Sequence, residues 1–316
     1  MALTSKKVVT LQKFPHIFSV ETVLGCNLSC PECAVGGKHV NRKYGYLKYD
    51  QFVHIADKIR GYCEYLYLHL WGEPMLNPDI FKMIEYANEF TRTNISTNAN
   101  TLTRETAMRL ACSGADIIVS IDGMTQGCYA RYRQGGDVAR ALETLAWLAE
   151  YGGYNSSPGT FSQFVARIQD KLGLGAVKAN IQPQYVVFEH NESEMKAFKE
   201  YCHSLGLAAK FKSPYLRKGS PLKNSSLAEF RRDIQSAPEI RKKAMRACTD
   251  IDNVFTILLD GRVVACCYDH NGITSFGNIF EQSVEEILAS SSRKDFARAL
   301  SDGRPPAFCL AECLMY

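Results

Sequence analysis

The stretch His16-Ile-Phe-Ser-Val-Glu-Thr-Val-Leu-Gly-Cys26-Asn-Leu-Ser-Cys30-Pro-Glu-Cys33 joins an apolar run to a tight group of cysteines. The run from His16 to Leu24 is rich in β-branched and aliphatic residues, which is typical of a strand. Three thiols then follow within eight residues, so one loop can bring all three to a single metal centre. The stretch therefore predicts a strand that leads into a metal-binding loop.

Downstream of this loop, strand-like apolar runs alternate with segments of helical spacing. Predicted strands cover 65–71, 94–97, 116–121, 181–188 and 207–212, and predicted helices cover 52–59, 80–90, 103–112, 139–151 and 192–205. Such alternation indicates parallel strands joined by right-handed crossovers. We expect an α/β fold, a partial (βα)6 TIM-like barrel with its active groups on the loops after the strands. The polar run 152–159 predicts a surface loop.

The C-terminal part has a different organisation. Val254 to Cys266 contains two apolar runs around Asp260-Gly261, a strong signal for a β-hairpin. Helices are expected over 284–289 and 294–300. We therefore predict three parts, which are the barrel over 1–215, a basic linker over 216–247 and a small hairpin-and-helix domain over 248–316.

Composition narrows the class of protein. The apolar runs are far shorter than the roughly 20 residues of a membrane span, and the N-terminus lacks the apolar centre of a signal peptide, so we expect a cytoplasmic protein that does not enter membranes. A net charge of +4 does not by itself indicate a nucleic-acid partner, and we expect none. Between Lys210 and Arg246, 11 Lys or Arg face three acids, which predicts either a solvated surface or a site for an anionic substrate or an acidic electron donor.

Twelve cysteines are many for a cytoplasmic chain, where metal ligation is a commoner use than a disulfide. Three cysteines leave one iron of a [4Fe–4S] cluster open to an exogenous ligand. Zinc with His39 as fourth ligand, or a disulfide, are the alternatives at this point. A second group gathers near the C-terminus, and the scattered remainder are interpreted as buried structural thiols: the group is Cys248, Cys266, Cys267, Cys309 and Cys313, and the remainder are Cys63, Cys112, Cys128 and Cys202.

The C-x3-C-x2-C pattern of Cys26, Cys30 and Cys33 resembles the radical S-adenosylmethionine (SAM) superfamily, and the resemblance covers nearly the whole chain. Further segments at the ends of predicted strands resemble the SAM-binding segments of that family. These are Trp71-Gly72-Glu73-Pro74, Ser96-Thr97-Asn98-Ala99, Ser120-Ile-Asp122-Gly123 and the run from Tyr129 through Tyr132-Arg133 to Gly136. Trp71 and Ala99 stand where glycine is usual in the family, and Glu32 where an aromatic residue often flanks the adenine.

The resemblance implies a catalytic [4Fe–4S] cluster on the first three cysteines, whose open iron binds the amino and carboxylate groups of SAM. It implies that Gly72, Glu73 and Pro74 receive the amino group and that Arg133 pairs with the carboxylate, although a surface helix position is the alternative for Arg133. The ribose side is implied to lie against Ser96, Asn98, Ser120 and Asp122. The implied chemistry is reductive cleavage of SAM and hydrogen abstraction by the 5′-deoxyadenosyl radical, with electrons from a flavodoxin- or ferredoxin-type donor.

The second cysteine group resembles the short, twitch- or SPASM-like auxiliary domain of radical SAM enzymes. This resemblance implies a second [4Fe–4S] cluster on Cys248, Cys266, Cys309 and Cys313. Cys267 would point to the opposite side of an extended strand from Cys266, so we expect it to be packed, and it is the first substitute if a ligand is misassigned. A zinc knuckle is the alternative for four cysteines.

The resemblance to radical SAM alcohol dehydrogenases favours hydrogen abstraction from a small polar substrate, sugar- or cyclitol-like, with net oxidation. The alternative substrate is a ribosomal peptide, which is less favoured because only 25 residues precede Cys26, fewer than a leader-recognition domain needs. The alternative of another class is a non-catalytic iron–sulfur or zinc scaffold. Asp269, with Tyr268 and His270 beside it, is the candidate acceptor of a substrate proton.

Overall fold

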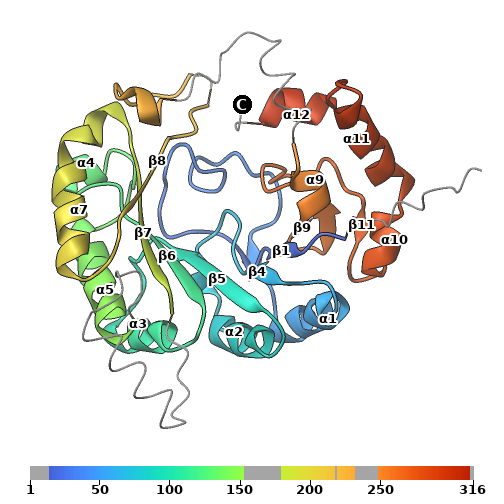
Figure 1. Cartoon of the computed structure of the whole chain (residues 1–316), viewed down its shortest axis with the longest axis horizontal. Coiled ribbons are helices and arrows are strands. Elements are labelled where there is room, and N and C mark those ends of the chain that lie inside the picture. The colour runs from blue at the N-terminus through green and yellow to red at the C-terminus, as the bar shows by residue number, and fades with distance from the viewer. Residues whose placement is uncertain (1–13, 153–178, 218, 232–247, 314–316) are drawn as a thin grey trace, which may run out of the picture.

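A computed structural model of the chain describes residues 14–152, 179–217, 219–231 and 248–313. Its centre is a nine-stranded sheet in the order β11-β10-β9-β1-β4-β5-β6-β7-β8. The sheet curves, with helices on its convex side and the cysteine loop, drawn in blue, inside the curve (Figure 1). The six parallel strands β1 and β4 to β8, with the helices between them, make the expected partial (βα)6 barrel. The predicted fold class is confirmed.

The barrel strands and their connecting helices lie close to the predicted ranges. The strands are β1 (Ile17–Val20), β4 (Tyr65–Tyr67), β5 (Arg92–Thr97), β6 (Asp116–Ser120), β7 (Ile181–Val186) and β8 (Lys210–Lys212). The helices are α1 (Tyr49–Ile59), α2 (Ile80–Asn88), α3 (Arg104–Ala111), the short α4 (Gln126–Tyr129), α5 (Val138–Tyr151) and α7 (Met195–Ser204). Three short 3-10 helices complete this part, η1 (Pro74–Leu76), η2 (Glu189–Glu194) and η3 (Ala228–Phe230).

Helix spacing and capping explain these elements. In α1, the buried residues Phe52, Ile55, Ala56 and Ile59 recur every three or four positions and form one apolar face. In α5, the carboxylate of Asp137 accepts hydrogen bonds from the first free backbone N–H groups, which fixes the start of the helix. These helices bury the outer face of the sheet and leave the loops at the carboxyl ends of the strands free to build a site.

The predicted strand 16–24 is broken in the structure. β1 ends at Val20, and β2 (Val23–Leu24) pairs in antiparallel fashion with β3 (Gly45–Tyr46) in a separate two-stranded sheet. Glu21, which lies at the break, is fully buried and is committed to partners outside the strand. Because the chain turns here, the following cysteine loop runs toward the centre of the barrel.

The C-terminal part contributes to the same sheet. The predicted hairpin is confirmed as β9 (Val254–Ile257) and β10 (Arg262–Val264), with Gly261 at φ +84° in the turn, where glycine is favoured. β9 lies parallel to β1, with Ile17 opposite Val254. The remaining elements are α9 (Asp250–Asn253), β11 (Gly277–Asn278), α10 (Val284–Leu288), α11 (Ser291–Ser301) and α12 (Ala307–Glu312).

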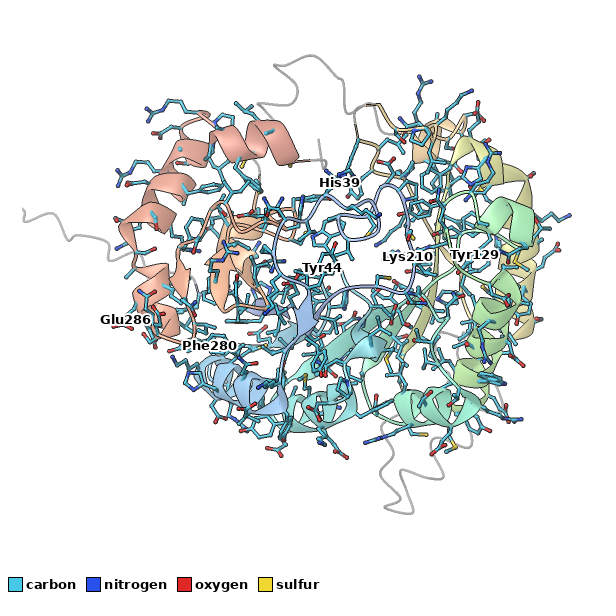
Figure 2. All side chains as sticks on the ribbon, turned by 180° about the vertical axis from the view of Figure 1, so that it is seen from behind. His39, Tyr44, Tyr129, Lys210, Phe280 and Glu286 are labelled. Carbon is cyan, nitrogen blue, oxygen red and sulfur yellow. The ribbon has the colours of Figure 1, made fainter. Side chains whose placement is uncertain are left out.

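The division into three domains stays a prediction. Most of the predicted surface loop, 153–159, and most of the basic linker, 232–247, lie outside the described residues. Contacts between the barrel and the C-terminal part are plain elsewhere: Phe280 lies beside α1, with its ring 6.0 Å from that of His54 (Figure 2). Among the described helices, none combines the length and the apolar character that a membrane crossing requires.

A buried ion pair joins three parts of the chain. Both oxygens of the Glu21 carboxylate accept hydrogen bonds from the guanidinium of Arg42, each at 2.8 Å, and one of them also accepts from the backbone N–H of Leu259 at 2.9 Å. Arg42 Nε donates to the carbonyl of His270 at 2.6 Å. The pair therefore connects the end of β1, the cysteine loop and the C-terminal hairpin.

We expect Arg42→Ala to lower the free energy of unfolding by roughly 3–5 kcal/mol, because it leaves the Glu21 carboxylate buried without a counter-charge. The measurement is urea denaturation of the purified protein. Arg298→Ala is the matched control, since the side chains of Arg298 and its partner Asp295 are both 69% exposed and such pairs contribute no more than about 1 kcal/mol. Equal effects in the two variants would contradict the role of the buried pair.

Candidate active site

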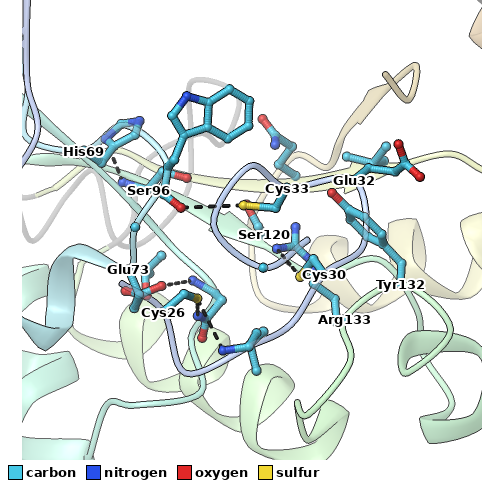
Figure 3. Close-up of a pocket in the computed structure, with 18 of the residues that line it drawn as sticks. Cys26, Cys30, Glu32, Cys33, His69, Glu73, Ser96, Ser120, Tyr132 and Arg133 are labelled. Atoms are coloured by element: carbon cyan, nitrogen blue, oxygen red, sulfur yellow. Dashed lines mark hydrogen bonds between the residues drawn. The ribbon is translucent and has the colours of Figure 1, made fainter. Parts of the chain in front are cut away.

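A cavity of about 290 Å³ opens where the parallel strands end. Its wall takes residues from the cysteine loop and from the carboxyl end of each strand from β4 to β8, as the barrel predicts (Figure 3). The lining residues include Cys26, Cys30, Cys33, His69, Trp71, Gly72, Glu73, Ser96, Asn98, Ser120, Tyr132, Arg133, Gln184, Lys212 and Tyr215. Most of the predicted SAM-binding residues are thus brought together, whereas Pro74 and Asp122 lie behind the wall.

The three cysteines face this cavity from one loop. Cys26 Sγ accepts hydrogen bonds from the backbone N–H of Leu28 at 3.3 Å and from Asn98 Nδ2 at 3.6 Å. Cys33 Sγ donates to the carbonyl of Trp71 at 3.6 Å. Burial raises the pKa of the Cys26 thiol to about 11 and that of Cys30 to about 12. A bound cation would reverse this effect, because thiols that ligate a metal do so as thiolates.

Glu73 is held rigidly at the cavity wall. Its carboxylate accepts hydrogen bonds from Thr97 Oγ1 at 2.7 Å, the backbone N–H of Asn98 at 2.8 Å and that of Met75 at 3.2 Å. Burial raises its pKa to about 7 in spite of these hydrogen bonds, which act in the opposite direction. An ammonium group entering the cavity would favour the charged form, so this carboxylate suits the amino group of SAM.

Two backbone positions explain the small residues around Glu73. A Cβ atom on Gly72 would lie 2.2 Å from the carbonyl oxygen of Val23, so only glycine allows the close approach of these two loops. Ala99 adopts φ +62°, the left-handed region. This is why glycine is usual at the position of Ala99 in the resembling family, and the alanine here carries a modest backbone strain.

Asp122 and Arg133 form a second buried ion pair. Arg133 Nε donates to Asp122 Oδ2 at 2.6 Å, and the other carboxylate oxygen accepts from the backbone N–H of Val186 at 2.5 Å. Arg133 Nη1 lies 4.0 Å from Cys30 Sγ (Figure 3). The guanidinium is thus oriented beside the cysteine loop with donors left for a carboxylate, and it is not the solvated surface residue of the alternative reading.

Sequence reasoning missed two polar groups of the cavity, His69 and Gln184. The backbone N–H of Ser96 donates to His69 Nδ1 at 3.1 Å, so the neutral ring carries its proton on Nε2. Burial lowers the pKa of His69 to about 4, which keeps the ring neutral. Gln184 Oε1 is buried and has no hydrogen-bond partner among the described residues. The sequence signal that could have identified both residues is a polar side chain within a predicted strand that is otherwise largely apolar.

Glu32, which replaces a usual aromatic residue, has a different task here. Its carboxylate accepts from the backbone N–H of Arg217 at 2.7 Å and from the hydroxyl of Ser220. These hydrogen bonds hold the segment after β8 against the cysteine loop. Ser213 and Tyr215 of the same segment line the cavity.

The auxiliary cysteines surround a second, smaller pocket. Cys248, Cys266, Cys309 and Cys313 all line it, together with apolar residues of α11 and α12, whereas Cys267 does not. Four thiols around an apolar pocket suit an iron–sulfur cluster.

Asp269 is placed away from the cavity wall. Its carboxylate accepts from the backbone N–H groups of Ile273 and Thr274 and from the Thr274 hydroxyl, at 2.7 to 2.8 Å. These contacts shape the loop after Cys267. A catalytic role for Asp269 stays a prediction, and the observed contacts indicate a structural one.

The comparisons with known proteins agree with this geometry. The Radical SAM superfamily matches residues 20–162, and the SPASM iron–sulfur cluster-binding domain matches residues 248–314. The chain thus contains a radical SAM domain followed by a SPASM domain. The two domains imply a catalytic [4Fe–4S] cluster, SAM and an auxiliary iron–sulfur cluster, as expected from the sequence.

Two curated relatives share part of the chain. The AdoMet-dependent heme synthase of Methanosarcina barkeri is 27% identical over 128 residues, 40% of this chain and 36% of that protein. The protein of the same name from Nitratidesulfovibrio vulgaris is 25% identical over 135 residues, 42% of this chain and 36% of that protein. The matched part is little more than a third of the length of either relative.

Solved structures share the fold over most of the chain. BtrN in complex with AdoMet and 2-DOIA is 16% identical with a TM-score of 0.55, covering 93% of this chain and 89% of BtrN. Streptococcus suis SuiB bound to S-adenosylmethionine is 14% identical with a TM-score of 0.64, covering 96% and 72%. Native anSMEcpe with bound AdoMet is 14% identical with a TM-score of 0.61, covering 94% and 88%.

The raised pKa of Glu73 predicts a pH-dependent stability of the metal-free chain. Between about pH 4.5 and 7 the folded state keeps the proton that the unfolded state has lost, so this contribution to stability is present at low pH and declines as pH rises through the folded pKa, by about 3 kcal/mol in all. We expect the difference in unfolding free energy between wild type and Glu73→Gln to change in this direction. A difference that is constant across the pH range would contradict the assignment.

The auxiliary pocket predicts different effects for two adjacent cysteines. We expect Cys266→Ala to lose about four irons per chain after anaerobic reconstitution, because one of four ligands is removed. Cys267→Ala, the matched control, should retain the iron content of the wild type, since Cys267 does not line the pocket. The measurement is iron and sulfide per chain, and the reverse pattern would assign Cys267 as the ligand.

Proposed function

We propose that this enzyme abstracts a hydrogen atom from a small, hydroxylated substrate, sugar- or cyclitol-like, in a net oxidation aided by the auxiliary cluster. The observation that carries the proposal is the buried, unpartnered Gln184 Oε1 at the cavity wall. An unpaired buried acceptor is costly, and a substrate hydroxyl would satisfy it. His69 Nε2–H offers a donor from the same wall, so the pair suits a group that both donates and accepts.

The proposed ligands of the catalytic cluster are Cys26, Cys30 and Cys33, and those of the auxiliary cluster are Cys248, Cys266, Cys309 and Cys313. When bound, the catalytic cluster and SAM supply the radical that removes a substrate hydrogen atom. We assign Glu73 to the SAM amino group, Arg133 to its carboxylate, and Ser96, Asn98 and Ser120 to its ribose side. Asp122 acts through Arg133, because it orients the guanidinium.

The size of the cavity supports a small substrate. Its 290 Å³ is at the lower limit of the roughly 300–1,000 Å³ typical of ligand pockets, and SAM would occupy part of it. The rings of Tyr132 and Phe188, with centroids 4.7 Å apart, form an apolar wall that keeps water from the reacting groups. Lys212 at the end of β8 adds a positive charge, which would favour an anionic substituent on the substrate.

A peptide substrate is the second candidate, and neighbours of the same fold favour it. SuiB has been solved with its precursor peptide SuiA, and anSMEcpe with a Cp18Cys peptide, at TM-scores of 0.61 and 0.59. The match to the BtrN complex, which contains 2-DOIA, covers 89% of BtrN, whereas the match to the SuiB–SuiA complex covers 70% of SuiB; the two cover 93% and 96% of this chain. The names of the curated relatives suggest a haem precursor as a third candidate substrate.

A flavodoxin- or ferredoxin-type protein is the proposed electron donor.

The defining test compares wild type with the Cys26→Ala/Cys30→Ala/Cys33→Ala variant after anaerobic reconstitution. We expect about eight irons per chain in the wild type and about four in the variant. Release of 5′-deoxyadenosine from SAM with dithionite should be lost in the variant, because the cluster whose open iron would bind SAM is absent and the remaining irons belong to the auxiliary cluster. Retained cleavage in the triple variant would overturn the assignment of the catalytic cysteines.

The substrate class is tested separately by mass analysis of products after incubation with a panel of sugars, cyclitols and their phosphates. A loss of two hydrogens from one of these compounds supports the proposal. A mass change confined to a peptide offered in parallel would overturn the small-substrate assignment in favour of the second candidate.

A further inference from the structure

Trp71 lies between the two cysteine sites. It lines the cavity on one side, and its indole Nε1 donates a hydrogen bond of 2.6 Å to the carbonyl of Cys267, the neighbour of the auxiliary cysteine Cys266. Its ring centroid is 6.3 Å from that of Tyr268, which lines the auxiliary pocket, and 6.0 Å from that of His270. One side chain thus contacts the loop that carries an auxiliary cysteine.

The backbone of the same residue contacts the first cysteine group. The carbonyl of Trp71 accepts from Cys33 Sγ at 3.6 Å, and its side chain packs against the small apolar cluster of Leu24, Ala34, Val35 and Val40 under the cysteine loop. Trp71, which lines the cavity, is therefore in direct contact with Tyr268, which lines the auxiliary pocket.

The backbone after Trp71 is tightly packed and hydrogen-bonded. Gly72 lies so close to the Val23 carbonyl that even a Cβ atom would not fit, and the backbone N–H of Glu73 donates to the carbonyl of Gly25 at 2.9 Å. A displacement of the Trp71 backbone would therefore move Glu73 or break these contacts, because close-packed groups transmit displacement. The contacts of Trp71 thus link the loop 266–270 to Glu73, the proposed partner of the SAM amino group.

We propose that Trp71 is a positioning residue that couples the auxiliary site to SAM binding. This inference rests on the proposed function, since it takes Glu73 as a SAM contact. The glycine that is usual at this position in the family has no side chain with which to contact Cys267, Tyr268 or His270. The coupling is thus a property of this chain's own tryptophan.

The first experiment is a double-mutant cycle on SAM affinity, measured by equilibrium binding to anaerobically reconstituted protein. Trp71→Phe keeps an aromatic ring and loses the N–H donor, and Cys266→Ala opens the auxiliary site. We expect each change to weaken SAM binding by about threefold or more, and the double variant to be no weaker than the stronger single one. Effects that multiply in the double variant would overturn the coupling.

The control in this cycle is Trp147→Phe, the other tryptophan of the chain, which lies on α5 beside Arg140. We expect it to leave SAM affinity unchanged alone and to combine independently with Cys266→Ala. Coupling of equal size at Trp147 would show a general loss of stability and overturn the specific role of Trp71.

A second readout needs neither cluster nor SAM. In metal-free Trp147→Phe protein, Trp71 is the sole tryptophan, and its fluorescence reports its surroundings. We expect Tyr268→Leu to shift the emission to longer wavelength and to increase quenching by acrylamide, because the ring loses a neighbour. An unchanged spectrum would overturn the contact. If the reconstituted wild type did not cleave SAM, the proposed function would be refuted, whereas the fluorescence comparison would still test the contact between Trp71 and Tyr268.

Discussion

The buried carboxylate of Glu21 sets the arrangement on which the rest of the structure depends. A charge in this position must be paired, because burial without a partner costs far more than any packing nearby can return. Its partners come from Arg42 and from the backbone of Leu259, so pairing it requires that the cysteine loop and the C-terminal hairpin approach the end of β1 together. The same residue interrupts the strand and turns the chain inward. The pairing of Glu21 with Arg42 therefore helps to place the loop that carries the first three thiols.

Inside the curved sheet, charge is distributed around the cavity in complementary positions. Glu73 offers a carboxylate on one side, and Arg133, held by Asp122, offers a guanidinium on the other. This arrangement matches a zwitterionic ligand with an amino and a carboxylate group. Burial raises the pKa of the Cys26 and Cys30 thiols, which keeps these two protonated until a metal compensates the charge. The polar interior contrasts with the apolar layer under the outer helices, which stabilises the barrel without taking part in binding.

Much of the barrel could be predicted because its signals are local. The alternation between strand-like and helix-like spacing of apolar residues predicted the order of strands and helices. The positions of the cysteines predicted two separate metal sites. The break at Glu21 and the position of β9 beside β1 depend on contacts between residues far apart in the chain, so the periodicity of a local segment cannot predict them. His69 and Gln184 were not predicted as site residues for a related reason, because only the folded structure brings both side chains to one cavity. Asp269 shows the converse, because proximity in sequence to Cys266 suggested chemistry while its hydrogen bonds serve the loop.

The pairing of β1 with β9 also orders events during synthesis. Glu21 and Leu259 are 238 positions apart, so at a translation rate of about 5–20 residues per second the first strand waits roughly 10–50 s for its neighbour. During that interval the edge of β1 is unpaired and the Glu21 carboxylate lacks the backbone N–H of Leu259. A growing chain thus exposes its first three thiols well before the wall around them exists. The hairpin therefore completes the pairing of β1 and of Glu21 only after the strands that line the cavity, β4 to β8, have been made.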